Sequence, residues 1–192
     1  MNATITSTAH YVPEKVLTNS DLEKLVDTSD EWIKSRVGIN QRHVVSDGEA
    51  SSDMSTKVAH SLLEKRGISA ANIDVIIIGT VTPDHPTPST AAIVQNNINA
   101  ENAWAFDLSA ACSGFLYALE TGAKFIESGQ YKTIMVIGVD TMTSILDFED
   151  RETCIIFGDG AGGVILEASK SNTGILGSVL KTDDQEQRAS MC

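Results

Sequence analysis

The sequence has few of the features of a secreted or disulfide-bonded protein. Its 192 residues include three cysteines, Cys112, Cys154 and Cys192, an odd number at wide spacing that suits neither a disulfide framework nor a zinc site. The N-terminus has neither the basic region nor the apolar stretch of a signal peptide. We therefore expect a cytoplasmic protein in a reducing compartment.

Long apolar runs and positive charge are also scarce. No apolar segment approaches the roughly 20 residues that cross a bilayer as a helix. The chain carries 14 Lys and Arg against 26 Asp and Glu, and its formal net charge is −12. Because nucleic acids and anionic membranes are themselves negative, this balance argues against both as general partners. It leaves room for a local basic patch that binds a phosphorylated cofactor.

The remaining composition, with 42% hydrophobic and 21% charged residues, is typical of one globular domain. Hydrophobic periodicity predicts strands and helices that alternate along the chain. We expect extended segments at 3–11, 42–45, 75–81, 103–108, 133–139, 154–157, 164–168 and 174–180. We expect a short helix capped by Asn19 or Ser20, and further helices beginning near Ser29, at Ser52, at Ala91 and at Ala110. Apolar strands connected by helices indicate an α/β fold with a mainly parallel or mixed sheet covered on both faces.

One cysteine stands at the junction between a predicted strand and a predicted helix. Strand 103–108 is followed by Ser-Ala-Ala-Cys-Ser-Gly, which places Cys112 in the first turn of a helix that extends to about Ser128. Free backbone N–H groups and the helix dipole favour an anion there, so the nucleophilic thiolate form is favoured. The small residues from Ser109 to Gly114 leave space for an acyl group. The alternative is a small buried cysteine that serves as packing.

The helix after Cys112 has an unusual composition, because no charged residue occurs from Ala110 to Leu119. A helix that is apolar all round belongs inside a larger protein rather than on the surface of a short one. We therefore expect a further layer of structure to cover the far face of this helix.

A glycine-rich segment, Gly158-Asp-Gly-Ala-Gly-Gly163, fits the G-x-G-x-x-G pattern of dinucleotide-binding folds. That pattern requires a helix after the glycines, whose N-terminus receives the pyrophosphate. The next residues, Val164-Ile-Leu-Glu-Ala, instead have strand character. We therefore expect a tight hairpin between strands 154–157 and 164–168, in which the glycines permit close backbone packing.

A nucleophilic cysteine usually works with a histidine base. Of the four histidines, His10, His43 and His60 lie where surface or structural roles are usual, and His85, in a proline-rich loop after a strand, is the one local candidate. The G-x-S-x-G elbow of serine hydrolases does not occur in the sequence. The chain thus contains a nucleophile without a convincing base.

Two side chains suited to nucleotide binding, Trp32 and Arg36, lie one helical turn apart. An aromatic ring beside a guanidinium group can stack on adenine and pair with phosphate. The simpler interpretation is a half-buried Trp beside a solvated Arg. Arg151 lies in an acidic loop and by itself indicates a surface ion pair.

Three segments together resemble the β-ketoacyl-[acyl-carrier-protein] synthase III family, the initiating condensing enzymes of bacterial fatty-acid synthesis. They are Asp27-Thr-Ser-Asp-Glu-Trp-Ile-Lys-Ser-Arg36, Phe106-Asp-Leu-Ser-Ala-Ala-Cys-Ser-Gly-Phe115 and Phe157-Gly-Asp-Gly-Ala-Gly162, in family-like order and spacing. The resemblance implies a thiolase-like fold of two similar α/β halves, a homodimer, and no metal or redox cofactor. It also implies that Cys112 takes an acyl group from acyl-CoA, and that this thioester condenses with malonyl-acyl-carrier-protein with loss of CO₂.

The same resemblance implies further site residues. Trp32 and Arg151 would hold the adenine of CoA between them, and Thr28 and Arg36 would contact its nucleotide portion. Phe157 and the loop around Thr87 would line the acyl pocket, the loop doing so across the dimer. Because Thr87 is small, this pocket has room for a branched or longer starter acyl group.

The resemblance covers one half of the family's length. The other half supplies the catalytic His and Asn, the second oxyanion-hole N–H and the basic surface for the carrier protein, none of which can be assigned here. We expect residues 1–180 to form an N-terminal half-domain and 181–192 a truncated tail, with the C-terminal half absent. Such a chain would become acylated on Cys112 slowly at most and would not condense.

Two alternatives to this interpretation remain. The first is a non-catalytic remnant that dimerises or pairs with a separately encoded C-terminal half. The second is another thiolase-fold acyltransferase, of the polyketide or hydroxymethylglutaryl-CoA synthase type. The segment Asp30-Glu-Trp-Ile-Lys-Ser-Arg36 favours synthase III over the second alternative.

Overall fold

A computed structural model describes residues 2–169, 171 and 173–182. Its centre is a five-stranded sheet in the order β1-β7-β6-β4-β5, with bounds Ala3–Tyr11, Asp159–Ala168, Thr133–Thr141, Val75–Gly79 and Trp104–Leu108. Strand β4 runs parallel to β5 and β6, whereas β7 runs antiparallel to β6 and β1. The predicted α/β fold is confirmed, and its sheet is mixed.

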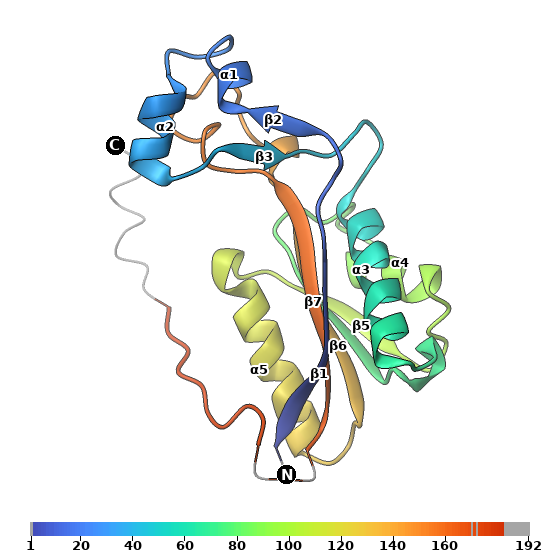
Figure 1. The fold of residues 1–192 in the computed structure, drawn as a ribbon. Helices are drawn as coiled ribbons and strands as arrows, with labels where there is room; N and C mark the ends of the chain where they lie inside the picture. The colour runs from blue at the N-terminus through green and yellow to red at the C-terminus, as the bar shows by residue number, and fades with distance from the viewer. Residues whose placement is uncertain (1, 170, 172, 183–192) are drawn as a thin grey trace.

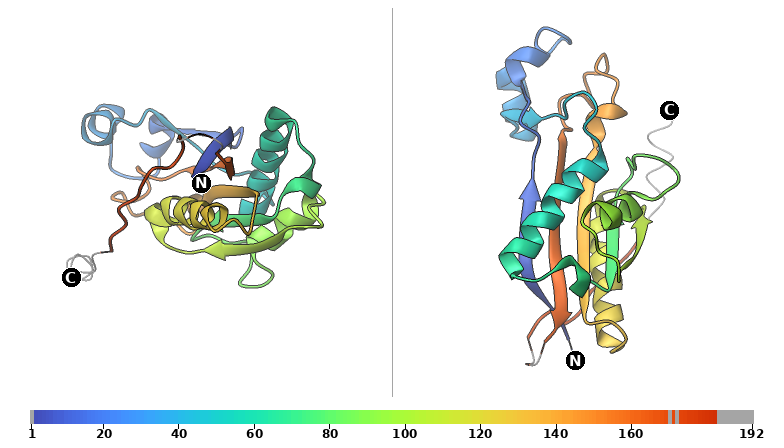
Figure 2. Two further views of the ribbon diagram at one scale, coloured as in Figure 1. Left: turned by 90° about the horizontal axis from the view of Figure 1, so that it is seen from below. Right: turned by 90° about the vertical axis from the view of Figure 1, so that its right-hand side faces the viewer.

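Helices cover both faces of this sheet (Figures 1 and 2). Helices α3 (Ser51–Arg66) and α4 (Thr90–Asn97) lie on one face, and α5 (Gly114–Glu127) lies on the other. Successive strand residues point to opposite faces, so Met135 and Ile137 pack with α3 while Val136 packs with α5. Among the described residues, no helix is long and apolar enough to cross a bilayer.

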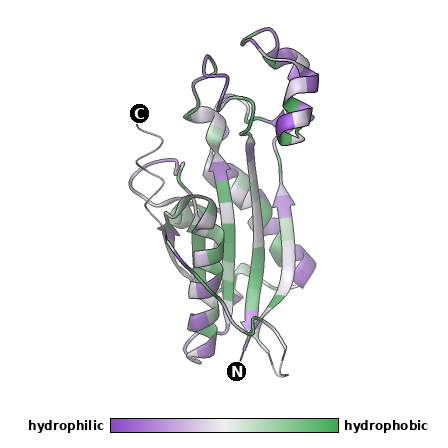
Figure 3. Cartoon of the chain, turned by 90° about the vertical axis from the view of Figure 1, so that its left-hand side faces the viewer, coloured by the Kyte–Doolittle hydropathy of each residue, from purple (hydrophilic) through white to green (hydrophobic). Residues whose placement is uncertain are grey.

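A small unit extends from the end of the sheet, at the top of Figure 1. It consists of the antiparallel strands β2 (Val16–Thr18) and β3 (Gln41–His43) and the helices α1 (Asn19–Leu22) and α2 (Asp30–Val37). Its core is formed by Leu22 and Ile33, packed against Cys154 and Ile155 from the segment before β7. In Figure 3 the two helices of this unit are largely hydrophilic, whereas apolar residues follow the central strands.

The helix ends follow local chemistry, with one correction. The Ser29 side chain caps α2 by accepting from the Trp32 N–H, and Gly38 ends this helix in the left-handed region at φ 73°. The predicted cap of α1, Asn19 or Ser20, is wrong: Thr18 caps it in a capping box with Asp21. The Asn19 side chain is instead buried, and its amide nitrogen donates hydrogen bonds within the small unit.

The predicted hairpin around the glycine run is wrong. Residues 154–156 form a turn, and Gly160, Gly162 and Gly163 lie inside β7, which continues from Asp159 to Ala168 as one strand. Close packing explains at least one of them, since a Cβ at Gly163 would lie 2.9 Å from both Ile137 Cγ1 and the Val136 carbonyl oxygen. No helix follows the run, so the dinucleotide alternative also fails.

The predicted strand at 174–180 is also wrong. This segment is extended and runs beside α5 in Figure 1, but it makes its backbone bond to the sheet at Ile175, which donates to the Ala3 carbonyl at 2.8 Å. Beyond that point Leu176 and Val179 are 76% and 84% exposed. This single bond to the first residue of β1 does not extend into a ladder, so the segment is not a strand. Residues 183–192 of the predicted tail lie outside the described residues.

Candidate active site

Cys112 lies in a tight turn between β5 and α5. The helix was expected from Ala110, but it begins at Gly114, and Ala111–Ser113 form a single 3₁₀ turn before it. Ala111 has a φ of 46°, in the left-handed region that is costly for a residue with a Cβ. The Cys112 thiol is free and exposed, so the alternative of a buried packing cysteine is contradicted.

Two glycines allow this turn to lie directly on the sheet. A Cβ at Gly79, the last residue of β4, would lie 2.9 Å from the Gly114 carbonyl carbon and 3.0 Å from the Phe115 nitrogen. A Cβ at Gly138 of β6 would lie 3.2 Å from the Phe115 side chain. The glycines therefore hold Cys112 over the carboxyl ends of the parallel strands, where ligands of open α/β sheets bind.

A cavity of about 500 Å³ opens beside Cys112. Its walls come from the ends of β4 and β6, the turn at Cys112 and the segment that enters β7: Gly79, Val81, Ala111, Cys112, Phe115, Gly138, Val139, Asp140, Met142, Phe157, Gly158 and Gly160. Phe157, for which the resemblance implies a place in the acyl pocket, lines this cavity. Thr87 is exposed on the loop after β4 and is not among the residues that line this cavity within one chain.

The histidines do not supply a base at this cavity. All four lie in the described part of the chain, and none lines the cavity. His85 lines a neighbouring hollow together with Pro83 and Pro86. His43 is engaged elsewhere, with its Nδ1 2.6 Å from the Pro13 carbonyl oxygen.

The predicted nucleotide-binding residues come together on α2 and the loop before β7. The guanidinium carbon of Arg151 lies 5.1 Å from the Trp32 ring centroid, and that of Arg36 lies 6.0 Å away. Arg151 also pairs with Asp27 at 3.6 Å. The buried Oγ1 of Thr28 has no hydrogen-bond partner in the described structure.

The spacing of this cluster has a consequence for adenine binding. A ring held between Trp32 and Arg151 needs a van der Waals separation of about 3.5 Å on each side. The observed 5.1 Å is too short for that, so Arg151 must move away from Trp32 before adenine can enter. Its partner Asp27 is fully exposed, which makes this movement inexpensive.

A buried arginine connects this cluster to the cavity. Arg42 of β3 donates to the Ile155 carbonyl oxygen through Nε at 3.1 Å and again through Nη2, and to Asn19 Oδ1 through Nη1 at 2.6 Å. Burial lowers the pKa of this guanidinium group. Because Phe157 follows Ile155 by two residues, Arg42 fixes the segment between Arg151 and the cavity wall. The sequence offered no signal for this role.

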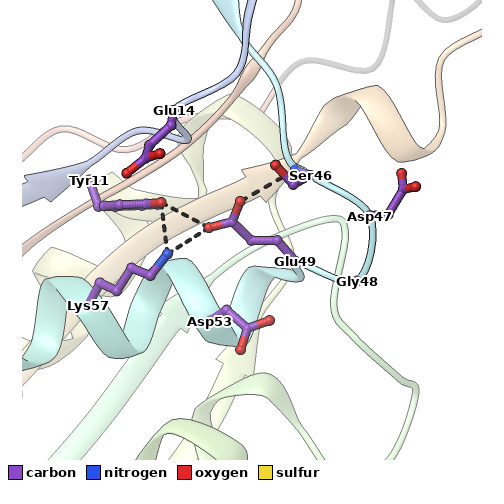
Figure 4. Close-up of a pocket in the computed structure, with 8 residues that line it drawn as sticks. All are labelled: Tyr11, Glu14, Ser46, Asp47, Gly48, Glu49, Asp53 and Lys57. Carbon is purple, nitrogen blue, oxygen red and sulfur yellow. Dashed lines mark hydrogen bonds and ion pairs between the residues drawn. The ribbon is translucent and has the colours of Figure 1, made fainter.

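A second cavity, of about 440 Å³, lies on the α3 side and is shown in Figure 4. Lys57 Nζ contacts Tyr11 Oη and Glu49 Oε1, each at 2.8 Å. The bonds to Glu49 and Tyr11 raise the pKa of Lys57. Burial raises the pKa of Glu49, but the bonds from Lys57 and Tyr11 lower it more. Within the described residues, no three His, Cys, Asp or Glu side chains are grouped to hold a metal ion.

The strand–turn–helix junction that carries Cys112, set on this mixed sheet, defines a thiolase-like fold. The structure of 3-oxoacyl-[acyl-carrier-protein] synthase III from Aquifex aeolicus is 46% identical and superposes with a TM-score of 0.86 over 88% of this chain and 55% of that one. A priming β-ketosynthase of the R1128 polyketide pathway is 32% identical, with a TM-score of 0.86 over 88% of this chain and 51% of its own.

Comparison of sequences identifies the family. The β-ketoacyl-[acyl-carrier-protein] synthase III of Chlorobaculum tepidum is 60% identical over 185 residues, which are 95% of this chain and 56% of the relative. Residues 106–184 match the sequence model of 3-oxoacyl-[acyl-carrier-protein] synthase III. The chain belongs to the β-ketoacyl-[acyl-carrier-protein] synthase III family and matches its N-terminal portion. It spans about half the length of the curated relatives it matches.

Proposed function

We propose that Cys112 is the acyl-accepting nucleophile of a 3-oxoacyl-[acyl-carrier-protein] synthase III. Its thiolate attacks the thioester carbonyl of an acyl-CoA, the carbon–sulfur bond to CoA breaks, and CoA leaves as its thiolate. Malonyl-acyl-carrier-protein then loses CO₂, and the resulting carbanion attacks the acyl-Cys112 carbonyl. The Cys112 sulfur leaves, and the product is a 3-oxoacyl-carrier-protein.

One observation carries this proposal. Cys112 is exposed on a turn with unfavourable backbone geometry and faces a largely apolar cavity of about 500 Å³. A packing residue would be covered, and a strained turn is costly to keep unless it presents a reactive group. The cavity wall at Phe157 suits an acyl chain.

The cluster of Trp32, Arg36 and Arg151 is proposed to bind the nucleotide end of CoA. Stacking on Trp32 and the two positive charges suit adenine and its phosphates, and the unpartnered Thr28 hydroxyl can bond a polar ligand atom. Arg42 and the segment 151–157 join this cluster to the cavity. One chain would thereby bind both the nucleotide end and the acyl end of an acyl-CoA.

The condensation step is proposed to need residues from a second half. None of the four histidines of this chain lines the cavity, so no histidine here is placed to stabilise the carbanion. Loss of preorganised transition-state donors costs about 10²–10³-fold in rate for each donor. We therefore expect acylation of Cys112 in this chain alone to be slow, and condensation to be undetectable.

Acylation is tested by incubating the chain with acetyl-CoA and locating the added mass by peptide mass spectrometry. The acetyl group is expected on Cys112, to be released by hydroxylamine, and to be lost in Cys112→Ala. Arg36→Ala is expected to slow the reaction at low acetyl-CoA, whereas Lys34→Ala, on the same helix and paired with Asp30, is the matched control. An acetyl group found elsewhere, or on no residue, would refute the proposal.

A second candidate function, a partner-dependent half of a split enzyme, is favoured by the exposed surface around α5. Leu116 on α5 is 55% exposed, and Ile156, which directly precedes the cavity residue Phe157, is 43% exposed. Size-exclusion chromatography of the chain alone tests this second candidate, and a stable monomer argues against a partner. In a separate activity assay, recovery of condensation on adding the C-terminal half of a family member would support the split-enzyme candidate.

A further inference from the structure

A carboxylate at the end of β6 organises one wall of the Cys112 cavity. Asp140 Oδ1 accepts from the Val81 N–H at 2.8 Å and the Thr82 N–H at 3.2 Å. The same oxygen accepts from the hydroxyl groups of Thr80 at 3.0 Å and Thr82 at 2.9 Å. Four donors from three consecutive residues therefore converge on one carboxylate oxygen.

The strand register explains why Asp140 reaches these groups. In the parallel pair of β4 and β6, Gly79 is opposite Gly138, so the residues that follow β4 emerge beside Asp140. Ile134 and Val136 of β6 face α5, and alternation places Gly138 and Asp140 on that same face. Asp140 and Val81 both line the Cys112 cavity.

The backbone N–H groups that follow β4 need an acceptor, because the strand ends at Gly79 and the residues after it leave the sheet. Buried N–H groups beyond the last ladder bond require a partner. Thr82 strengthens the junction, since its Oγ1 accepts from the Thr141 N–H at 2.8 Å and its carbonyl accepts from Ser51 Oγ at 2.7 Å. The segment 80–82 is thus tied to both β6 and α3 before the loop that carries Thr87 begins.

We propose that Asp140 is a positioning residue that fixes Val81 at the cavity wall, and so sets the size of the group that can react at Cys112. This inference deepens the proposed function, because it names the residue that controls acyl-group selectivity. Charge-assisted bonds to a carboxylate are roughly twice as strong as neutral ones, which makes this anchor stiff. Without it, Val81 moves away and bulky groups gain access relative to small ones.

The chain offers a close control for this role. Asp74, at the opposite end of the sheet, accepts from the Lys132 N–H at 2.7 Å and the Thr133 N–H at 3.0 Å. It anchors the start of β6 as Asp140 anchors the exit of β4, but it does not line the cavity. A purely structural role predicts similar behaviour for substitutions at the two positions.

The test compares Cys112 labelling in the full chain by N-ethylmaleimide and by the bulkier N-phenylmaleimide, followed on the Cys112 peptide by mass spectrometry. In Asp140→Ala the ratio of phenyl to ethyl labelling is expected to rise severalfold, because a displaced Val81 leaves more room for the phenyl ring beside Cys112. Asp140→Asn, which keeps the shape and one acceptor, is expected to restore part of the original ratio. Asp74→Asn is expected to leave the ratio unchanged.

Thr80→Val provides a variant that does not depend on folding of the Asp140 substitutions, because it removes one of the four donors and keeps side-chain shape. It is expected to raise the ratio less than Asp140→Ala does. An unchanged ratio in Thr80→Val and Asp140→Asn, or an equal rise in Asp74→Asn, would overturn the inference. Maleimide labelling needs no acyl-CoA. The labelling ratio therefore tests the role of Asp140 even if the proposed acyl transfer to Cys112 is not observed.

Discussion

The two faces of the central sheet differ in how completely this chain covers them. On the α3 face, Met54, Val58 and Leu62 are fully buried against Ile76 and its neighbours. On the α5 face, Leu116 is 55% exposed and Trp104 42% exposed. The sheet residues that face α5, such as Ile77 and Val136, are also buried, so the open part of this face is the outer side of α5 and the sheet edge at Trp104.

The strand residues reflect the same division. Towards α3, β4 and β6 present branched or long side chains such as Ile78 and Ile137 at their carboxyl ends. Towards α5, the corresponding positions are Gly79 and Gly138, where α5 descends onto the sheet. The Cys112 turn and its cavity occupy the face on which these strand ends carry glycine.

The largest expected effect comes from the closed face. Leu62→Ala is expected to lower the free energy of unfolding by about 2–5 kcal/mol, because it leaves a cavity in a close-packed region. Urea unfolding followed by circular dichroism measures this loss. If Leu62→Ala lowered the free energy of unfolding less than Leu116→Ala does, the α3 face would not be the more closely packed of the two.

The next effect lies where α5 meets the sheet. Gly79→Ala places a Cβ 2.9 Å from the Gly114 backbone, which cannot be relieved by a side-chain rotation. We expect a loss of about 1–3 kcal/mol, as for overpacking, together with a changed rate of Cys112 alkylation.

Gly162→Ala is the control for this substitution, because its nearest atom would be the Ala9 carbonyl oxygen at 3.9 Å. Its stability and Cys112 alkylation rate are expected to stay close to those of the unmodified chain. Equal effects at the two glycines would refute the close approach at Gly79.

The sequence was sufficient to predict most elements and the junction between a strand and a helix at Cys112. Apolar periodicity located β4, β6 and α3, and the small residues around Cys112 indicated the turn between β5 and α5. The absence of charge from Ala110 to Leu119 predicted a further layer of structure over this helix, and Leu116 on the helix is 55% exposed in this chain. These features are local, so a short stretch of sequence carries them.

Features that depend on distant contacts could not be predicted. The glycines of β7 fit a hairpin as well as a strand until Ile137 and Val136 are placed beside Gly163. The roles of Arg42 and Asp140 arise from partners 113 and about 60 residues away in sequence. A carboxylate at the end of an apolar strand is the one signal that could have drawn attention to Asp140.

A smaller effect is expected at the rim of the closed face, in the cluster of Tyr11, Glu49 and Lys57 (Figure 4). The pKa of Glu49 is lowered in the folded chain, so its stabilising contribution is present above its unfolded value of about 4.3 and is lost as pH falls through the folded value. Glu49→Gln is expected to cost at most about 1 kcal/mol at pH 7, because Lys57 is half exposed.

Urea unfolding from pH 7 to pH 3 measures this contribution. The difference between Glu49→Gln and the unmodified chain is expected to shrink as the pH falls below about 4.3. Asp47→Asn, in the same cavity, is the matched control. A difference that stays constant over this range would show that the ionised pair contributes nothing.

The smallest effect on stability is expected on the open face, at Leu116 of α5. It tests most directly whether the two faces of the sheet differ in how far this chain covers them. Leu116→Ser removes a large apolar side chain that is 55% exposed, so the free energy of unfolding is expected to change by no more than about 0.5 kcal/mol. Leu119→Ser, on the same helix but packed against the core, is expected to cost more. If this face binds a second half or a second copy, Leu116→Ser weakens that association while leaving the isolated chain folded. Sedimentation velocity measures the association, and a stability loss at Leu116 as large as that at Leu119 would mean that the face is already closed within one chain.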